Sequence, residues 1–137
     1  MSSDLPIVLA KGWATVDTDR AVVEMAHLLR SGSDFRIAAP CQHLGARCWI
    51  GVARDDTPDG VGLIVILEPS TEGRLAATLA RHGEGWCATW EVAGAARDDP
   101  TARASVRRDG PLGLERLVPG PTAGPHRLVV ESDTIGP

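Results

Sequence analysis

Three side chains of this sequence are candidates for general acid–base chemistry: His43, Glu68 and Glu91. Glu68 follows a long apolar stretch, and desolvation in such a position raises the pKa of a carboxyl group, as a general base at neutral pH requires. The same residue precedes Pro69 and an expected helix, where a negative charge suits the helix dipole without any catalytic role. His43 falls in the bend of an expected hairpin, so it either reaches over a pocket as a proton donor or lies in solvent. The sequence leaves these alternatives open.

Soft metal ligands are spaced across the same hairpin as Cys41-x-His43-x4-Cys48. A structural zinc site normally needs two closely spaced pairs of ligands, whereas this segment supplies two thiols and one imidazole. We therefore expect packed thiols here rather than a metal site. The chain has three cysteines, which cannot all pair with one another, so we expect Cys41, Cys48 and Cys87 to be reduced.

Length and composition restrict the class of protein. The 137 residues are enough for one domain, and 43% apolar with 23% charged residues is a globular balance. The net charge of -4 comes without a run of like charge, which argues against nucleic acid or an anionic membrane as the partner. The longest apolar stretch near the start, residues 6–10, is too short for a signal peptide or a membrane span. We therefore expect a cytoplasmic protein.

The elements that must position these side chains follow from hydrophobic periodicity and turn signals. Asp17-Thr18-Asp19 offers a helix cap, and Asp99-Pro100 offers a cap with a first-turn proline. The Asp109-Gly110-Pro111 string is expected to end the helix that starts at Asp99. We predict strands over 7–16, 35–39, 47–53, 61–67, 86–92, 114–118 and 127–131, and helices over 17–30, 69–83 and 99–108.

This order predicts a single α+β domain, residues 1–137, in which a βαβββ module occurs twice. The strand and helix at 7–30 are echoed at 86–108, and hairpin regions follow each of them. We place the first module at 7–68, a linking helix at 69–85, and a shortened second module at 86–131. The second copy is expected to lack its last strand.

One segment resembles a known family. Three strings carry the resemblance: Leu67-Glu68-Pro69, Arg81-His82-Gly83-Glu84-Gly85-Trp86 and Glu91-Val92. They are similar to the LEP, GEG and EV strings of methylmalonyl-CoA epimerase-like members of the vicinal oxygen chelate superfamily. This superfamily is also called the glyoxalase/bleomycin-resistance/dioxygenase superfamily. The resemblance implies two βαβββ modules that form curved half-barrels. It also implies a homodimer, which an unpaired final strand edge would favour as well.

The resemblance further implies where a metal would be bound in metal-dependent members. The ligand positions fall near Ala10, near Val65, at Trp86-Cys87-Ala88 and on the strand that the chain is expected to lack. A divalent metal needs several converging lone-pair donors, and Ala and Val have none. We therefore expect no metal and no other cofactor.

Strand alternation around these positions predicts a ligand pocket if the family's register holds. Small residues would form one wall and two indoles the other, and such a surface favours a hydrophobic or planar ligand. The predicted ligand-binding residues are Gly12, Leu63, Val65, Leu67, Trp86, Ala88 and Trp90. The alternative is that both tryptophans only fill the core.

The function expected from the sequence is that of a metal-independent, glyoxalase-like protein that binds a small metabolite. In the first interpretation it is a lyase-, isomerase- or cyclase-type enzyme that uses His43, Glu68 or Glu91. In the second it is a non-catalytic binding protein, like the antibiotic-sequestering members of the superfamily. In the third it is a structural subunit whose degenerate half completes a partner.

Overall fold

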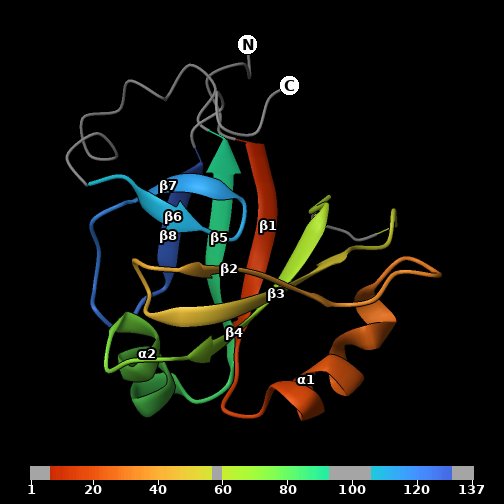
Figure 1. The fold of residues 1–137 in the computed structure, drawn as a ribbon, viewed down its shortest axis with the longest axis horizontal. Helices are drawn as coiled ribbons and strands as arrows, with labels where there is room; N and C mark the ends of the chain where they lie inside the picture. Colours follow the sequence, from red (N-terminus) through yellow and green to blue (C-terminus); the bar gives the residue numbers. More distant parts are fainter. Residues whose placement is uncertain (1–6, 57–59, 93–105, 131–137) are drawn as a thin grey trace.

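The computed structural model describes residues 7–56, 60–92 and 106–130 (Figure 1). The first half contains β1 (Ile7–Ala14), α1 (Thr18–Met25), the 3-10 turn η1 (Ala26–Leu28), β2 (Arg36–Cys41), β3 (Ala46–Val52) and β4 (Leu63–Pro69). The second half contains α2 (Arg74–His82), β5 (Gly85–Val92), β6 (Arg108–Gly110), β7 (Gly113–Leu117) and β8 (His126–Val130). Neither described α-helix is long and apolar enough to cross a membrane.

The strands form one eight-stranded sheet whose order is β2-β3-β4-β1-β5-β8-β7-β6. β1 pairs parallel with β4, β5 pairs parallel with β8, and β1 pairs antiparallel with β5 at the centre. The two halves of the order therefore mirror each other across the β1–β5 pair. This arrangement confirms the α+β fold of paired modules that the sequence predicts.

The expectation that the second module lacks its last strand is wrong. β8 pairs with β5 as β4 pairs with β1, so the fourth strand is present. The error lies at Arg108–Gly110, which forms β6 and not the end of a helix; it pairs antiparallel with β7. The string Asp-Gly-Pro-Leu-Gly is thus a hairpin turn. The module is still shorter, with three and five residues in β6 and β7, and residues 99–105 of the expected third helix lie outside the described residues.

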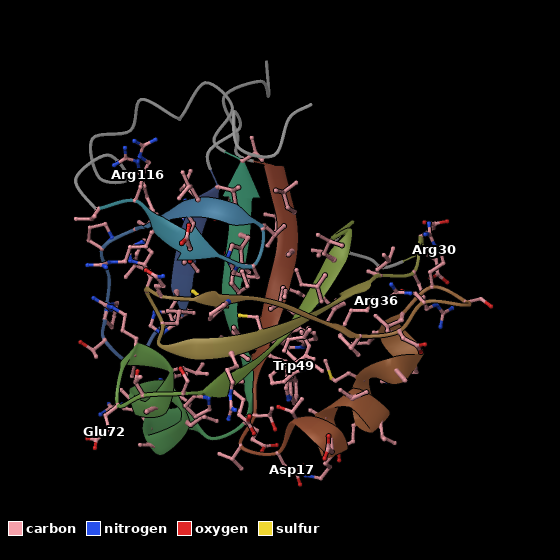
Figure 2. The ribbon with its side chains drawn as sticks, in the orientation of Figure 1. Asp17, Arg30, Arg36, Trp49, Glu72 and Arg116 are labelled. Atoms are coloured by element: carbon pink, nitrogen blue, oxygen red, sulfur yellow. The ribbon has the colours of Figure 1, made fainter. Side chains whose placement is uncertain are left out.

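The outer face of the first half of the sheet is covered by α1. The helix begins where Asp17 accepts a hydrogen bond from the backbone N–H of Arg20 (3.2 Å), as the sequence predicts. Its buried side chains Ala21 and Met25 pack with residues of β4, and Trp49 of β3 lies on the same side (Figure 2). The second helix begins at Arg74, later than residue 69, because Glu68 and Pro69 still belong to β4.

The inner face of the sheet holds the main core. Val65, Leu67 and Trp90 are fully buried there. A Cβ atom on Gly12 would lie 2.8 Å from atoms of both Leu67 and Trp90, so these two side chains fill the space over the central strands. Trp90 therefore has the core position that the alternative interpretation of the sequence describes.

The sheet curls until its two edge strands meet. The backbone N–H of Gln42, at the end of β2, donates to the carbonyl oxygen of Asp109 in β6 (3.2 Å). Figure 1 shows β6 and β7 above the left-hand ends of β2 and β3, with α2 below them. We call this junction of the β2–β3 turn, β6, β7 and the start of α2 the seam.

Candidate functional site

A buried carboxyl group lies just inside the seam. Glu115 of β7 is fully buried, and its carboxylate accepts hydrogen bonds from the indole N–H of Trp90 (2.8 Å) and the thiol of Cys41 (2.9 Å). Burial raises the pKa of Glu115 to about 7, and the two hydrogen bonds oppose that rise. Burial also raises the pKa of the Cys41 thiol. The carboxyl group of Glu115, which accepts from Trp90 and Cys41, thus changes charge near neutral pH.

Sequence reasoning missed Glu115. Its only signal is its place two residues before Leu117, because alternate strand residues share a face and Leu117 is a large apolar residue of the predicted strand. A β-carbon on Gly110, across the hairpin, would overlap the carboxylate, so the small residue makes room for it.

A pocket of about 490 Å³ opens at the seam. It is formed by the β2–β3 turn, the first residue of α2, both ends of the β6–β7 hairpin and the segment that follows β7. Its lining residues are Gln42, His43, Arg74, Val106, Arg108, Leu117 and Pro119. Apolar and cationic side chains thus share one opening, which we call the seam pocket.

His43 lies in the wall of the seam pocket. Its Nε2 is 3.2 Å from the backbone carbonyl oxygen of Glu115 and donates to it. Burial lowers the pKa of His43; the backbone of Glu115 and of Val106 raises it, and the charges of Arg108 and Arg74 lower it. The imidazole is therefore held by backbone carbonyl groups on the pocket wall, and its role in proton transfer stays a prediction.

The other two predicted catalytic residues have separate ion-pair partners. Glu68 accepts a hydrogen bond from Arg47 of the neighbouring strand (2.9 Å). Glu91 accepts two from Arg127 (2.9 and 3.0 Å), in a bidentate pair between β5 and β8. Each carboxylate is thus engaged by a guanidinium group, and neither is among the lining residues of the seam pocket.

Most of the predicted ligand-binding residues lie together on the inner face. Leu63, Val65, Leu67, Ala88 and Trp90 belong to one apolar cluster, and Gly12 lies against Leu67 and Trp90. Side chains occupy this part of the cup, so the interior here is packed core. Whether any of these residues binds a ligand stays a prediction.

Trp86 departs from the alternation that placed it with Ala88 and Trp90. The pairing of β1 with β5 shifts between Gly12 and Trp13, so that Gly12 is opposite Ala88 but Trp13 is opposite Trp86. This bulge turns Trp86 to the other face. There its ring meets that of Trp13 edge-on, with centroids 5.1 Å apart. A second pocket, of about 350 Å³, is lined in part by Trp86 and Cys87.

The positions that would hold the superfamily's metal do not suit one. Ala10 and Val65 are buried among hydrocarbon side chains, and Trp86 is turned to the opposite face. Nor do the soft ligands of the hairpin converge, since Cys41 donates to Glu115 and Cys48 to the carbonyl oxygen of Ala46 (3.8 Å). All three cysteines are free and buried.

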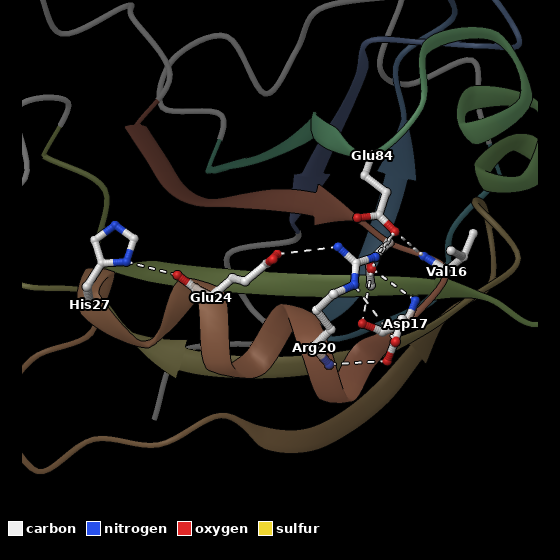
Figure 3. A network of polar contacts seen from close by, with 7 residues as sticks. Val16, Asp17, Arg20, Glu24, His27 and Glu84 are labelled. Carbon is white, nitrogen blue, oxygen red and sulfur yellow. Dashed lines mark hydrogen bonds and ion pairs between the residues drawn. The ribbon is translucent and has the colours of Figure 1, made fainter.

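The GEG string acts as an anchor between modules. Glu84 accepts hydrogen bonds from the Thr15 hydroxyl (3.1 Å), the Val16 N–H (3.1 Å) and the Arg20 guanidinium (2.6 Å) (Figure 3). The Val16 N–H is the first cause of the lowered pKa of Glu84. The segment on which the resemblance rests therefore fixes the start of α1 to the start of β5.

A further buried polar pair was not predicted. The His126 ring lies 2.9 Å from the Thr78 hydroxyl, which joins β8 to α2. Burial lowers the pKa of His126 to about 4, and the charge of Arg74 adds to that effect. His126 is therefore neutral at pH 7.

Solved methylmalonyl-CoA epimerases have a similar structure. A variant from Streptomyces coelicolor in complex with 2-nitronate-propionyl-CoA is 18% identical, with a TM-score of 0.66, over 93% of this chain and 99% of that chain. The epimerase from Mycobacterium tuberculosis is 19% identical, with a TM-score of 0.66, over 96% of this chain and 91% of that one. An epimerase in complex with methylmalonyl-CoA and NH4+ is 17% identical, with a TM-score of 0.68, over 97% and 99%.

No protein-family model matches the sequence, and no curated protein matches it significantly. The likeness is therefore carried by three-dimensional structure. The epimerases belong to the vicinal oxygen chelate superfamily, and the mirrored strand order of this chain agrees with that likeness. The chain has the vicinal oxygen chelate fold.

Proposed function

We propose that this protein binds a small organic molecule in the seam pocket and does so without a metal ion. The observation that carries the proposal is the pocket itself, about 490 Å³ of space with Arg74, Arg108 and Gln42 beside the apolar Leu117 and Pro119. A few polar groups among apolar walls are typical of small-molecule sites. The deeper part of the cup is filled by side chains, so a ligand would have to bind at a surface opening such as the seam pocket.

The contacts of the catalytic candidates favour binding over catalysis. Glu68 and Glu91 are each paired with an arginine. The ring of His43 is held by backbone carbonyl groups and donates to one of them. A carboxylate paired with an arginine is a weak base, and a neutral His43 that donates through Nε2 keeps a lone pair on Nδ1 alone. The arrangement is therefore closer to a sequestering protein, in which the ligand leaves unchanged.

An isomerase or lyase activity is the second candidate. It is favoured by the likeness to epimerases and by Glu115, whose pKa of about 7 suits proton transfer. Incubation with methylmalonyl-CoA in D2O tests it. If the protein is an isomerase or lyase, the substrate should take up deuterium only when the protein is present, and Glu115→Gln should abolish the uptake. If the protein only binds its ligand, no deuterium should be taken up.

Binding can be tested with a panel of aliphatic and aromatic acids, amides and alcohols, followed by two-dimensional NMR. Gln42→Trp adds a bulky side chain at the pocket and should abolish binding. Val23→Trp makes the same change at an exposed site on α1, at the other lower corner of the molecule from α2, and should leave binding unchanged (Figure 1). Binding by no member of the panel, or binding that survives Gln42→Trp, would contradict the proposal.

A homodimer and a cytoplasmic location remain parts of this proposal. Light scattering tests the first, with an expected mass twice the 14.5 kDa of one chain. A mass of one chain at micromolar concentration would exclude a stable dimer. Fractionation of cells that express the native gene tests the second.

A further inference from the structure

We infer that the ligand of the seam pocket carries a carboxylate or phosphate group, which Arg74 and Arg108 bind together. This inference rests on the proposed function and adds the chemical class of the ligand. The two arginines come from different elements, one from the first turn of α2 and the other from the first residue of β6. They line the same pocket, and the described residues of its lining include no acidic side chain.

The charge at this pocket is not neutralised by the described residues around it. Arg20, Arg47, Arg54 and Arg127 each form an ion pair with a carboxylate. Within the described part of the chain neither Arg74 nor Arg108 has such a pair. The polar contact recorded for Arg74 is a long one, 3.5 Å, to the carbonyl oxygen of Pro121.

The charges of the two arginines act on the imidazole of His43, which lines the same pocket. Burial is the main cause that lowers the pKa of His43, and the charges of Arg108 and Arg74 add to it. Burial likewise lowers the pKa of His126, and the charge of Arg74 adds to that effect. A neutral imidazole leaves the positive charge of the pocket to the guanidinium groups. In a chain whose net charge is -4, this local excess of positive charge selects an anion.

The other residues that line the seam pocket indicate the chemistry of the rest of the ligand. Val106, Leu117 and Pro119 give an apolar wall, and Gln42 adds an amide at the rim. Guanidinium groups bind carboxylate and phosphate oxygens through paired N–H donors. The pocket therefore fits a small acid with an apolar body, rather than a neutral planar molecule held by indoles.

The test uses benzoate, phenyl phosphate, benzamide and inorganic phosphate as probes of the full-length protein. Affinities come from amide and imidazole NMR shifts. We expect benzoate or phenyl phosphate to bind at least about tenfold more tightly than benzamide, because charged hydrogen bonds are stronger than neutral ones. A comparison of benzoate with phenyl phosphate and inorganic phosphate tells which anion is preferred and whether the apolar body contributes.

Arg74→Gln and Arg108→Gln should each weaken binding of the anionic probes about tenfold and leave benzamide unaffected. Arg36→Gln is the matched control, since this exposed arginine of β2 lines a different pocket and lies across the molecule from Glu72, which precedes α2 (Figure 2). The bound anion should also raise the pKa of His43, because it offsets the two positive charges. Melting temperatures show whether each variant is folded.

Failure of this inference and failure of the proposed binding function give different results. If benzamide binds as tightly as benzoate, or the arginine variants bind anions as the native chain does, the inference is wrong and the binding function stands. The same holds if only neutral molecules from the wider panel bind. If nothing in either set binds the native chain, the proposed function itself fails.

Discussion

The buried carboxyl of Glu115 makes the stability of this protein depend on pH in a direction opposite to that of most acidic groups. Burial raises its pKa from 4.5 to about 7. Between these values the folded chain keeps a proton that the unfolded chain has released. The folded state then binds more protons, so the free energy of unfolding falls as pH rises, and the loss is complete above about pH 7.

The magnitude follows from the shift. One pKa unit corresponds to about 1.4 kcal/mol, so the full effect is about 3 kcal/mol, and about 2.5 kcal/mol of it falls between pH 5 and pH 8. Glu115→Gln keeps an oxygen that accepts from Trp90 but removes the titration. The native chain should therefore lose about 2.5 kcal/mol relative to this variant across that range.

Urea unfolding at pH 5, 6, 7 and 8, followed by tryptophan fluorescence, measures the difference. Glu115→Leu serves as a second variant without titration. It should be less stable at every pH, because Trp90 and Cys41 lose their acceptor, yet its pH profile should parallel that of Glu115→Gln. Profiles of the native chain and both variants that run parallel from pH 5 to pH 8 would refute the reasoning.

Three further predictions concern the packing and the anchors. Gly12→Ala places a Cβ 2.8 Å from two fully buried side chains and should lower the free energy of unfolding by about 1–3 kcal/mol in urea unfolding. Gly62→Ala is the control: its Cβ would have its nearest neighbour at 3.8 Å, so it should lower that free energy by less than about 1 kcal/mol. Glu84→Gln weakens the anchor at the start of α1, so the Val16 amide should exchange faster with deuterium, while amides of β8 should not change. Trp90→Phe removes the indole N–H donor from the buried carboxyl and should raise the pKa of that group, as measured by carbon-detected NMR.

Local signals were sufficient for much of the fold. The Asp17 cap, the helical spacing behind it and the apolar run of β4 depend on residues close in sequence, and the repeated order of strands then gives the modules. β6 was missed for a local reason as well. Asp109-Gly110-Pro111 suits the end of a helix as well as a hairpin, and only pairing with β7 decides between them.

The site depends on contacts that no local pattern contains. The seam pocket exists because the sheet curls until Gln42 meets Asp109, and that curvature is a property of all eight strands. His43 and Arg108, 65 positions apart in the numbering, come together only there. The bulge in β5 is similar in kind, since one shift in pairing turns Trp86 away from Trp90.

The most direct test of the account is the position of a bound ligand in a crystal structure of this chain with a probe that binds. The account predicts density against His43, Arg74 and Arg108, with the apolar part of the molecule toward Leu117. Density between the central strands, over Gly12, or beside Trp86 in the second pocket would contradict it.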